Sequence, residues 1–309
     1  MNAEREQGFA LAAVLWLITA LSVLTLAAGL VARDALGASG NRMALLQAGW
    51  RAEGCMNAVR AGIARVLVQA APEPGGADTL WSNLDRLIDQ ASLGQAMGCE
   101  VRLVPAGLAL DVNQAESEPL TRLFVGRGEP PSSASAMAAA LLDWRDSDDS
   151  VRPEGAERAW YLARRRRPPR NGPLADLREL HWVRGFEQAT DLSGLLTVEP
   201  GRLLLTRAPL SVLATVPGFG EEALRAVERL RLPGVPFDLR DLMATLGTEG
   251  RDSLMIRFLE AARMVTRVPD AWICTVVARH EESAIQARME VRIVLSARVP
   301  VIVRRRTWF

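Results

Sequence analysis

The sequence contains no lysine, so all 37 of its strongly basic side chains are arginines. They balance 36 carboxylates to a formal net charge of +1. A chain with so little net charge has no overall field that would favour nucleic acid or an acidic substrate. An arginine-only composition is typical of a GC-rich coding bias. The short arginine runs at 164–167 and 304–306 are therefore interpreted as solvated surface.

Motifs for catalysis and metal binding are also scarce. The two histidines, His181 and His280, lie far apart, and the three cysteines form no C-x-x-C pair. This spacing argues against a histidine metal site and excludes a zinc ribbon or a thioredoxin motif. The sequence has no G-x-S-x-G, Walker A or H-E-x-x-H motif. We therefore expect a protein that is not an enzyme.

A long uncharged run stands near the N-terminus. Residues 9–32 carry no charged side chain, and a helix of that length crosses a bilayer core of about 30 Å. The polar residues 1–8 precede it and end in Gly8, which Phe9 follows. An ordinary secretory signal has a shorter apolar core with its cleavage site after the core. The run is therefore predicted to be a transmembrane helix, and a plain single-pass anchor is the simplest alternative.

The helical pattern continues beyond this run. Between residues 35 and 69, apolar side chains recur at steps of three or four, which predicts an amphipathic helix. The proline- and glycine-containing segment 71–78 then ends it. The residues expected to face a folded head are Met43, Leu46, Trp50, Cys55, Val59, Ile63 and Val66 or Leu67.

Strand-like runs lie at both ends of the remaining sequence, with helical and loop-rich sequence between them. This order predicts an α+β fold in which the helix of residues 9–70 packs on an antiparallel sheet that carries a large all-α insertion. The sheet-bearing frame is assigned to 71–112 and 264–309, and the insertion to 113–263. The expected strands are 99–104, 108–112, 272–278, 287–295 and 299–303.

Within the insertion, residues 208–231 read as two helices joined by a tight turn at 217–220. The stretch resembles a helix-hairpin-helix unit, which in some proteins presents backbone N–H groups to DNA phosphates. Its three arginines and three glutamates cancel, three minus three, which is poor for phosphate binding. The preferred interpretation is a compact packing unit.

Acidic residues are concentrated at 143–157. Carboxylates grouped in one loop suit Ca²⁺, and counting from Asp146 gives the ligand spacing of an EF-hand. Val151, however, stands where that loop needs glycine. A calcium site and a solvated acidic loop paired with nearby arginine both remain open. The candidate ligands are Asp143, Asp146, Asp148, Asp149, Glu154 and Glu157.

A short charged leader ending in Gly8, then Phe9 and an apolar run, resembles the class III signal of type IV pilins and pseudopilins. The resemblance implies cleavage by a prepilin peptidase after Gly8 and N-methylation of Phe9. Most pilins carry Glu at the fifth mature position, which here is Ala13, and the K-type minor pseudopilins of type II secretion systems are the members that lack it. The D-W-x-D-x-D motif beginning at Asp143 and the segment 173–185 are further stretches similar to this family.

Resemblance to the K-type family implies a non-catalytic subunit at the tip of a type II secretion pseudopilus. Such a subunit helps to initiate pseudopilus assembly and the export of folded proteins across the outer membrane. The resemblance also implies a single-pass inner-membrane protein with its head in the periplasm. That head is expected to bind calcium and to carry a helical, SAM-like insertion. The implied partners are I-type, J-type and major pseudopilins, with no nucleic acid. The alternative is a membrane-anchored helix-hairpin-helix DNA receptor of a competence-type uptake system.

A head outside the cytoplasm would lie where disulfides persist. Cys99 and Cys274 both fall on predicted frame strands. We expect these two to pair and Cys55 on the long helix to be free, with three buried thiols as the alternative.

Overall fold

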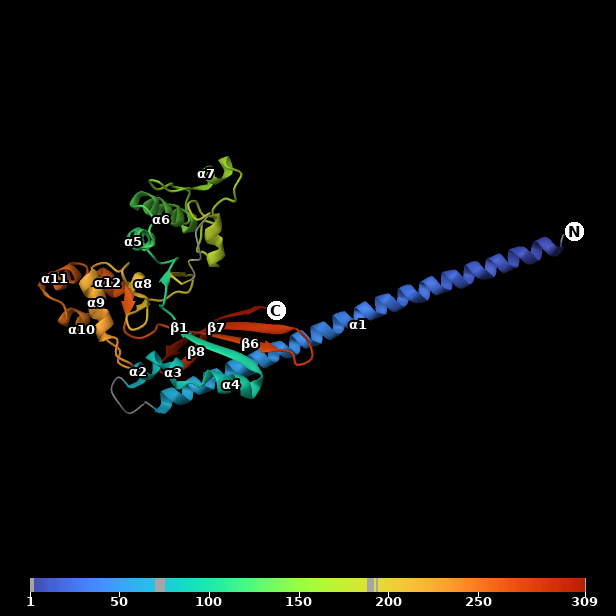
Figure 1. The fold of residues 1–309 in the computed structure, drawn as a ribbon, viewed down its shortest axis with the longest axis horizontal. Coiled ribbons are helices and arrows are strands. Elements are labelled where there is room, and N and C mark those ends of the chain that lie inside the picture. The colour runs from blue at the N-terminus through green and yellow to red at the C-terminus, as the bar shows by residue number, and fades with distance from the viewer. Residues whose placement is uncertain (1–2, 70–75, 188–191, 193, 309) are drawn as a thin grey trace.

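The computed structural model describes residues 3–69, 76–187, 192 and 194–308, and their side chains from Leu11 onward. A single long helix, α1, runs away from a head made of two parts, a sheet packed on the helix and a helical module beside the sheet (Figure 1). The α+β class predicted from the sequence is confirmed. The predicted cleavage site between Gly8 and Phe9 lies in the backbone of α1, but the side chain of Phe9 lies outside the described ones.

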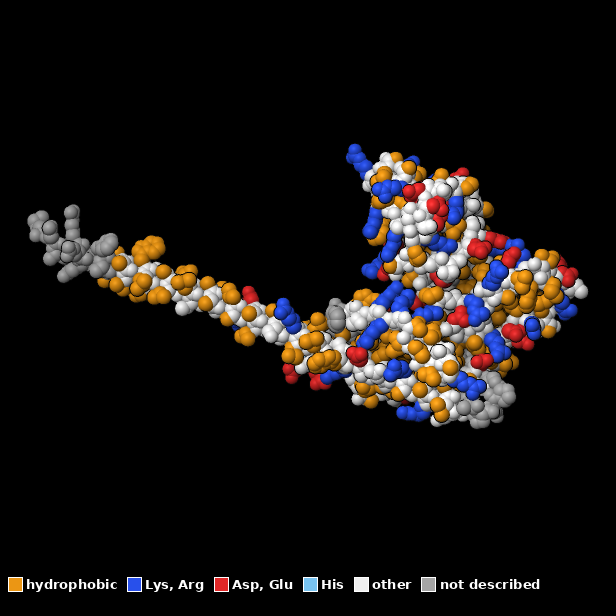
Figure 2. Space-filling view, turned by 180° about the vertical axis from the view of Figure 1, so that it is seen from behind, with side chains coloured by type: hydrophobic (Ala, Val, Ile, Leu, Met, Phe, Trp, Pro, Cys, Tyr) orange, Lys and Arg blue, Asp and Glu red, His pale blue; other side chains and the backbone are white. Residues whose placement is uncertain are grey.

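Helix α1 spans Ala3–Gln69, 67 residues without a break. Among the described residues it is the one helix long and apolar enough to cross a membrane. Its best window has a mean hydropathy of 2.3 and none of it is buried. The hydroxyls of the threonines and the serine in this segment donate hydrogen bonds to carbonyls three or four residues earlier, as from Thr19 to Leu15 at 3.0 Å. These bonds satisfy the hydroxyl groups without water. The apolar run thus projects alone, away from the head (Figures 1 and 2).

The C-terminal half of α1 packs on the sheet along the expected line from Cys55 to Leu67, but along a different line before Cys55. Met43, Leu46 and Trp50 are exposed, so that part of the predicted inward face is wrong. The reason is size, because small side chains on the adjacent face let the sheet approach the helix closely. The buried line consists of Ala44, Ala48, Ala52, Cys55, Met56, Val59, Ile63 and Leu67.

The sheet has four antiparallel strands in the order β1-β6-β7-β8. In β6, buried and partly buried residues alternate, as expected for a strand with one face on a core. Trp272 at its start is fully buried, lies edge-on to Trp81 with ring centroids 6.4 Å apart, and donates its indole N–H to the Trp81 carbonyl at 2.9 Å. The strands are β1 Cys99–Pro105, β6 Trp272–Arg279, β7 Gln286–Ser296 and β8 Val299–Trp308.

Three short helices connect α1 to the sheet. Asp89 caps the last of them by accepting from the Ser92 N–H at 3.0 Å, and Gly98 ends it with φ of 67°. This left-handed residue turns the chain directly into β1. The three helices are α2 Gly76–Ser82, α3 Leu84–Leu87 and α4 Gln90–Met97.

The helical module has a core of its own. Trp144 and Tyr161 meet edge-on at 5.2 Å within it, and Phe124 and Phe186 at 5.4 Å. Its longer elements are α5 Ser117–Gly126, α6 Pro131–Arg145, α7 Arg158–Ala163, the 3₁₀ helix η1 Leu177–Trp182, α8 Leu210–Leu213, α9 Glu221–Leu230, α10 Leu239–Ala244, α11 Thr248–Ile256 and α12 Phe258–Met264. Two short parallel strand pairs complete it, β2 Leu110–Asp111 with β3 Leu196–Thr197 and β4 Leu203–Leu204 with β5 Val265–Thr266.

The chain passes between the two parts at one place. The Ala106 N–H donates to the Ala271 carbonyl at 2.8 Å, where the chain leaves and re-enters the sheet. Gly107 follows with φ of 85° and lies against the backbone of Arg202, which leaves no room for a Cβ. The run 108–112, expected as a strand of the frame, therefore belongs to the core of the helical module and pairs there with β3.

The disulfide differs from the predicted one. Cys55 is bonded to Cys99, with their Cα atoms 6.7 Å apart, and Cys274 is the buried free thiol. The predicted Cys99–Cys274 pairing is wrong because of the register, in which Cys274 lies opposite Leu103 and Cys99 lies opposite Ala278. The first residue of β1 instead meets α1, so the disulfide links the long helix to the edge of the sheet.

Candidate cation site and assembly surface

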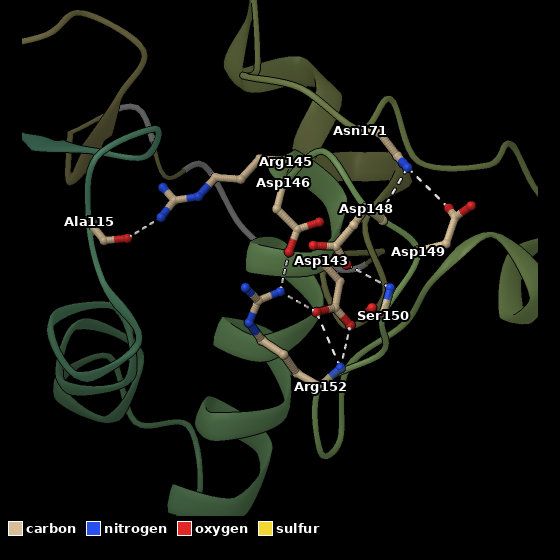
Figure 3. A network of polar contacts seen from close by, with 9 residues as sticks. All are labelled: Ala115, Asp143, Arg145, Asp146, Asp148, Asp149, Ser150, Arg152 and Asn171. Carbon is tan, nitrogen blue, oxygen red and sulfur yellow. Dashed lines mark hydrogen bonds and ion pairs between the residues drawn. The ribbon is translucent and has the colours of Figure 1, made fainter.

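The acidic loop between α6 and α7 brings three of its six candidate residues together. Ligand atoms of Asp143, Asp146 and Glu157 lie within 4.8 Å of one another. Asp143 stands on the last turn of α6 and is fully buried, Asp146 follows at the C-cap, and Glu157 is the N-cap residue of α7. The two helix ends therefore hold the three carboxylates. The loop that follows Asp146 folds back so that Arg152 lies beside Asp143 and Asp146 (Figure 3).

Arg152 lies against this cluster. Its guanidinium pairs with Asp143 at 2.7 Å and also with Asp146, and its backbone N–H points at the Asp143 carboxylate (Figure 3). The Arg152 side chain is 40% exposed, so it has room to leave the cluster. Three carboxylates minus one guanidinium leave a net charge of −2, which a divalent cation would neutralise.

Glu157 is the member of the cluster that lacks partners. The residue is 4% exposed, and both of its carboxylate oxygens are buried with no hydrogen bond, as is Oδ1 of Asp146. Burial, and then the charges of Asp143, Asp146 and Asp149, raise the pKa of Glu157 to about 7. Unsatisfied buried oxygens beside like charges are costly, and this is the donor set that a Ca²⁺ ion prefers. The residues present therefore fit a bound calcium ion.

The other three candidates do other things. Asp148 accepts from the Ser150 N–H at 2.8 Å, and Asp149 accepts from the Asn171 side chain at 3.0 Å. Glu154 is exposed and has a left-handed backbone, with φ of 64°. None of the three joins the group of ligand atoms, so the EF-hand spacing counted along the sequence does not describe the arrangement in space.

Two features of this site escaped the sequence. Pairing of the acidic loop with a nearby arginine was one of the two expected alternatives, but Arg152 was not named, and Gly155 was not considered at all. A Cβ on Gly155 would collide with Oδ2 of Asp143, so the loop needs glycine there to reach the cluster. The signal that could have found it is a glycine two residues before Glu157, between two carboxylates.

The hairpin at 208–231 is built into the module. Gly218, with φ of 82°, lies against the backbone of α11. Glu222, in the first turn of α9, accepts from the Gly247 N–H at 2.7 Å. Arg231 donates to the carbonyls of Leu205 and Ala208. The turn and the helices on both sides of it are thus engaged in internal packing.

A second surface with functional character lies on α1. Above the buried line, the helix exposes Leu36, Met43, Leu46 and Trp50, at spacings of seven, three and four residues that fall near one face of a helix. We call these four residues the α1 stripe. The stripe lies between the apolar N-terminal segment and the head, and orange side chains are visible along the projecting helix (Figure 2). An apolar helix face of this length, left open beside a folded head, is typical of an interaction surface.

Two of the comparisons with known proteins found a match, one to a family and one to a fold. Residues 82–198 match the family described as type II secretion system protein K. No curated protein matches the sequence. The fold is similar to a chain in the crystal structure of the GspK-GspI-GspJ complex from the type 2 secretion system of enterotoxigenic Escherichia coli. The TM-score is 0.63 at 17% identity, over 88% of this chain and 99% of that chain.

The matched region contains the acidic loop, α5 to α7 and the passage out of the sheet, and the shared fold extends the likeness to α1 and the C-terminal strands. The family match over residues 82–198 and the shared fold support the resemblance to a K-type minor pseudopilin of the type II secretion system.

Proposed function

We propose that the chain is a tip subunit that helps to initiate assembly of a type II secretion pseudopilus and so supports export of folded proteins across the outer membrane. One observation carries the proposal, the α1 stripe beside a head that bears a bulky helical module. The stripe offers helices of other subunits a place to pack on α1. The helical module extends the head sideways, which leaves little space for a further subunit above it.

The partners we propose are an I-type and a J-type minor pseudopilin, the proteins that accompany the related chain in the complex from Escherichia coli, with the major pseudopilin below them. Packing would run through Met43, Leu46 and Trp50, whose exposed apolar surface would be buried on association. Ala13 supports the tip position. A carboxylate at this position would need a partner group from a subunit above it, and this chain has no carboxylate there.

The assembly proposal is tested by changing the α1 stripe. Trp50→Asp should abolish co-purification with the I- and J-type partners while leaving the melting temperature of the head unchanged, since Trp50 is 68% exposed. The matched control is Val68→Asp on the same helix, where an apolar residue is equally exposed, at 73%, but lies outside the stripe. Equal recovery of partners by the wild type and the Trp50 variant would overturn the proposed contact.

We also propose the inner membrane and the periplasm as the location of α1 and of the head. A prepilin peptidase would cleave after Gly8 and Phe9 would be methylated. The Cys55–Cys99 disulfide supports an oxidising compartment for the head. Intact-mass measurement of the chain co-expressed with its peptidase should give a product beginning at N-methylated Phe9. A chain that keeps residues 1–8 would reduce the proposal to a plain membrane anchor.

The cation site is proposed to bind Ca²⁺ through Asp143, Asp146 and Glu157 and to have a structural role without catalysis. Binding would require Arg152 to release the carboxylates. Calcium should raise the melting temperature of the chain, and Asp143→Asn should remove that increase, whereas the control Asp148→Asn, outside the cluster, should retain it. Identical melting curves in calcium and in chelator would refute the site.

A further inference from the structure

The arginines around α7 form a surface that neither the assembly role nor the cation site uses. Trp160 on α7 has three guanidinium groups around its ring, with Arg164 at 4.3 Å, Arg184 at 5.1 Å and Arg166 at 5.7 Å from the ring centroid. Beside this group, Arg167 lies 4.2 Å from the ring centroid of Trp182. Guanidinium groups stacked on indole rings are held in place while the edges that bind anions stay free.

Most of this charge has no partner among the described residues. Arg166 pairs with Glu187, but Arg158, Arg164, Arg165 and Arg167 are exposed and form no ion pair within the described part of the chain. The nearest interaction of Arg164 is with the Trp160 carbonyl at 3.3 Å. Four like charges on one short segment repel one another unless an anion accompanies them. We call Arg158, Arg164, Arg165, Arg167, Leu162 and Trp182 the α7 face.

Apolar groups stand among these charges. Leu162 is 51% exposed and Trp182 is 37% exposed, both beside the arginines in sequence or by stacking. Arginine and tryptophan together with an exposed leucine are the residues that proteins place at the level of lipid headgroups. An acidic protein surface would need the charges but would gain nothing from a leucine turned to solvent.

The position of the α7 face favours a membrane as well. Helix α7 lies at the outer end of the lobe that rises beside α1, on the side of the head that looks back toward the N-terminal end (Figure 1). Basic side chains gather along the same edge of that lobe in the space-filling view (Figure 2). The apolar segment of α1 would place a bilayer on that side. Because the same chain is anchored there, even a weak attraction would act at high effective concentration.

We propose that the α7 face docks on the anionic phospholipid headgroups of the membrane that α1 spans, before the subunit joins its partners. Stacked guanidiniums would bind phosphate oxygens through their free edges, and Leu162 and Trp182 would enter the interfacial layer. The inference rests on the proposed anchoring by α1 and adds a resting position for the head. Assembly would then have to lift the α7 face from the lipid surface.

The test uses the full chain in nanodiscs of phosphatidylcholine alone or of phosphatidylcholine mixed with phosphatidylglycerol, read by amide hydrogen exchange. Residues 158–184 should be protected more strongly in the anionic discs, and added salt should remove the difference. Changing Arg164, Arg165 and Arg167 to glutamine should abolish it. Each arginine is expected to contribute about a fivefold factor to the docking equilibrium, so the triple variant should lose on the order of a hundredfold.

The control replaces three exposed arginines on the other side of the module, Arg225, Arg229 and Arg240, by glutamine and should keep the protection. Equal protection in both kinds of disc, or protection that appears only when an acidic protein partner is added, would overturn the inference. Failure of the chain to enter either disc would instead count against the anchoring by α1. The two failures are therefore distinguishable.

Discussion

The Cys55–Cys99 disulfide allows a quantitative prediction about the joint between α1 and the sheet. The bond closes a loop with a sequence separation of 44 residues. A cross-link of that span removes enough disorder from the unfolded chain to stabilise the folded state by about 4 kcal/mol in the chain-entropy treatment. Since whole domains are stable by about 5–15 kcal/mol, loss of the bond should remove a large share of the stability of this part.

The perturbation is Cys55→Ala together with Cys99→Ala, measured by urea unfolding of the full chain in mild detergent. Tryptophan fluorescence reports this part of the fold because Trp81 and Trp272 are buried in the core between α1 and the sheet. At a slope of about 2 kcal/mol per molar urea, a loss of about 4 kcal/mol lowers the midpoint by roughly 2 M. Reductant should produce the same decrease in the wild type and none in the double variant.

The control is Cys274→Ala, which leaves the disulfide intact and removes one buried sulfur. It should cost about 1 kcal/mol, as for a deleted methyl-sized group, and keep its response to reductant. Two results would refute the reasoning. One is a wild-type midpoint that reductant leaves unchanged, and the other is alkylation of all three cysteines in the unfolded, unreduced chain, where Cys274 alone should react.

Three further predictions concern the cation site and the sheet core. The pKa of Glu157 is raised from 4.5 to about 7, so the unfolded chain ionises first. In chelator the stability should therefore fall as pH rises between these two values, by up to about 1.4 kcal/mol per pH unit; melting curves of Glu157→Gln should lack this slope. Gly155→Ala should lower the unfolding free energy by about 1–3 kcal/mol and should abolish the stabilisation by calcium, because its Cβ would collide with Asp143. The control Gly172→Ala, with no atom within 4 Å of the new Cβ, should melt like the wild type. Trp272→Ala should lower the unfolding free energy by about 3–5 kcal/mol, and a loss below 1 kcal/mol by urea titration would contradict the packing described for Trp81 and Trp272.

The sequence predicted the fold class because it contains two strong local patterns. The uncharged run before Arg33 and the alternation in 272–278 each point to one kind of element, whatever surrounds them. The inward face of α1 was predicted correctly from Cys55 onward, but its earlier part was wrong because hydrophobicity alone favours Met43 and Trp50 over Ala44 and Ala48. Which face is buried depends on how closely the sheet approaches, and that is a property of packing rather than of pattern.

The predicted disulfide pairing was wrong, and the predicted set of cation ligands differs from the cluster in the structure, for a similar reason. Strand register, which sets Cys99 opposite Ala278, depends on the whole sheet and cannot be counted along one segment. The composition of the acidic loop indicates a cation site. The clustered carboxylates, however, come from two different elements, Asp143 from α6 and Glu157 from the start of α7. Linear spacing from Asp146 could not reveal which carboxylates converge.

The single passage at Ala106 and Ala271 has an evolutionary consequence. Since the chain leaves and re-enters the sheet at these two neighbouring residues, joined by a hydrogen bond of 2.8 Å, the segment between them could change in length without altering the pairing of β1 with β6. Only side-chain contacts such as those of Arg207 with Asp85 and of Glu199 with Arg304 would be lost. A short turn would suffice to rejoin β1 to β6, which are already antiparallel neighbours. A pilin-like subunit without the module could have acquired it by one gene insertion at this point, and the strand register of the sheet would have stayed the same.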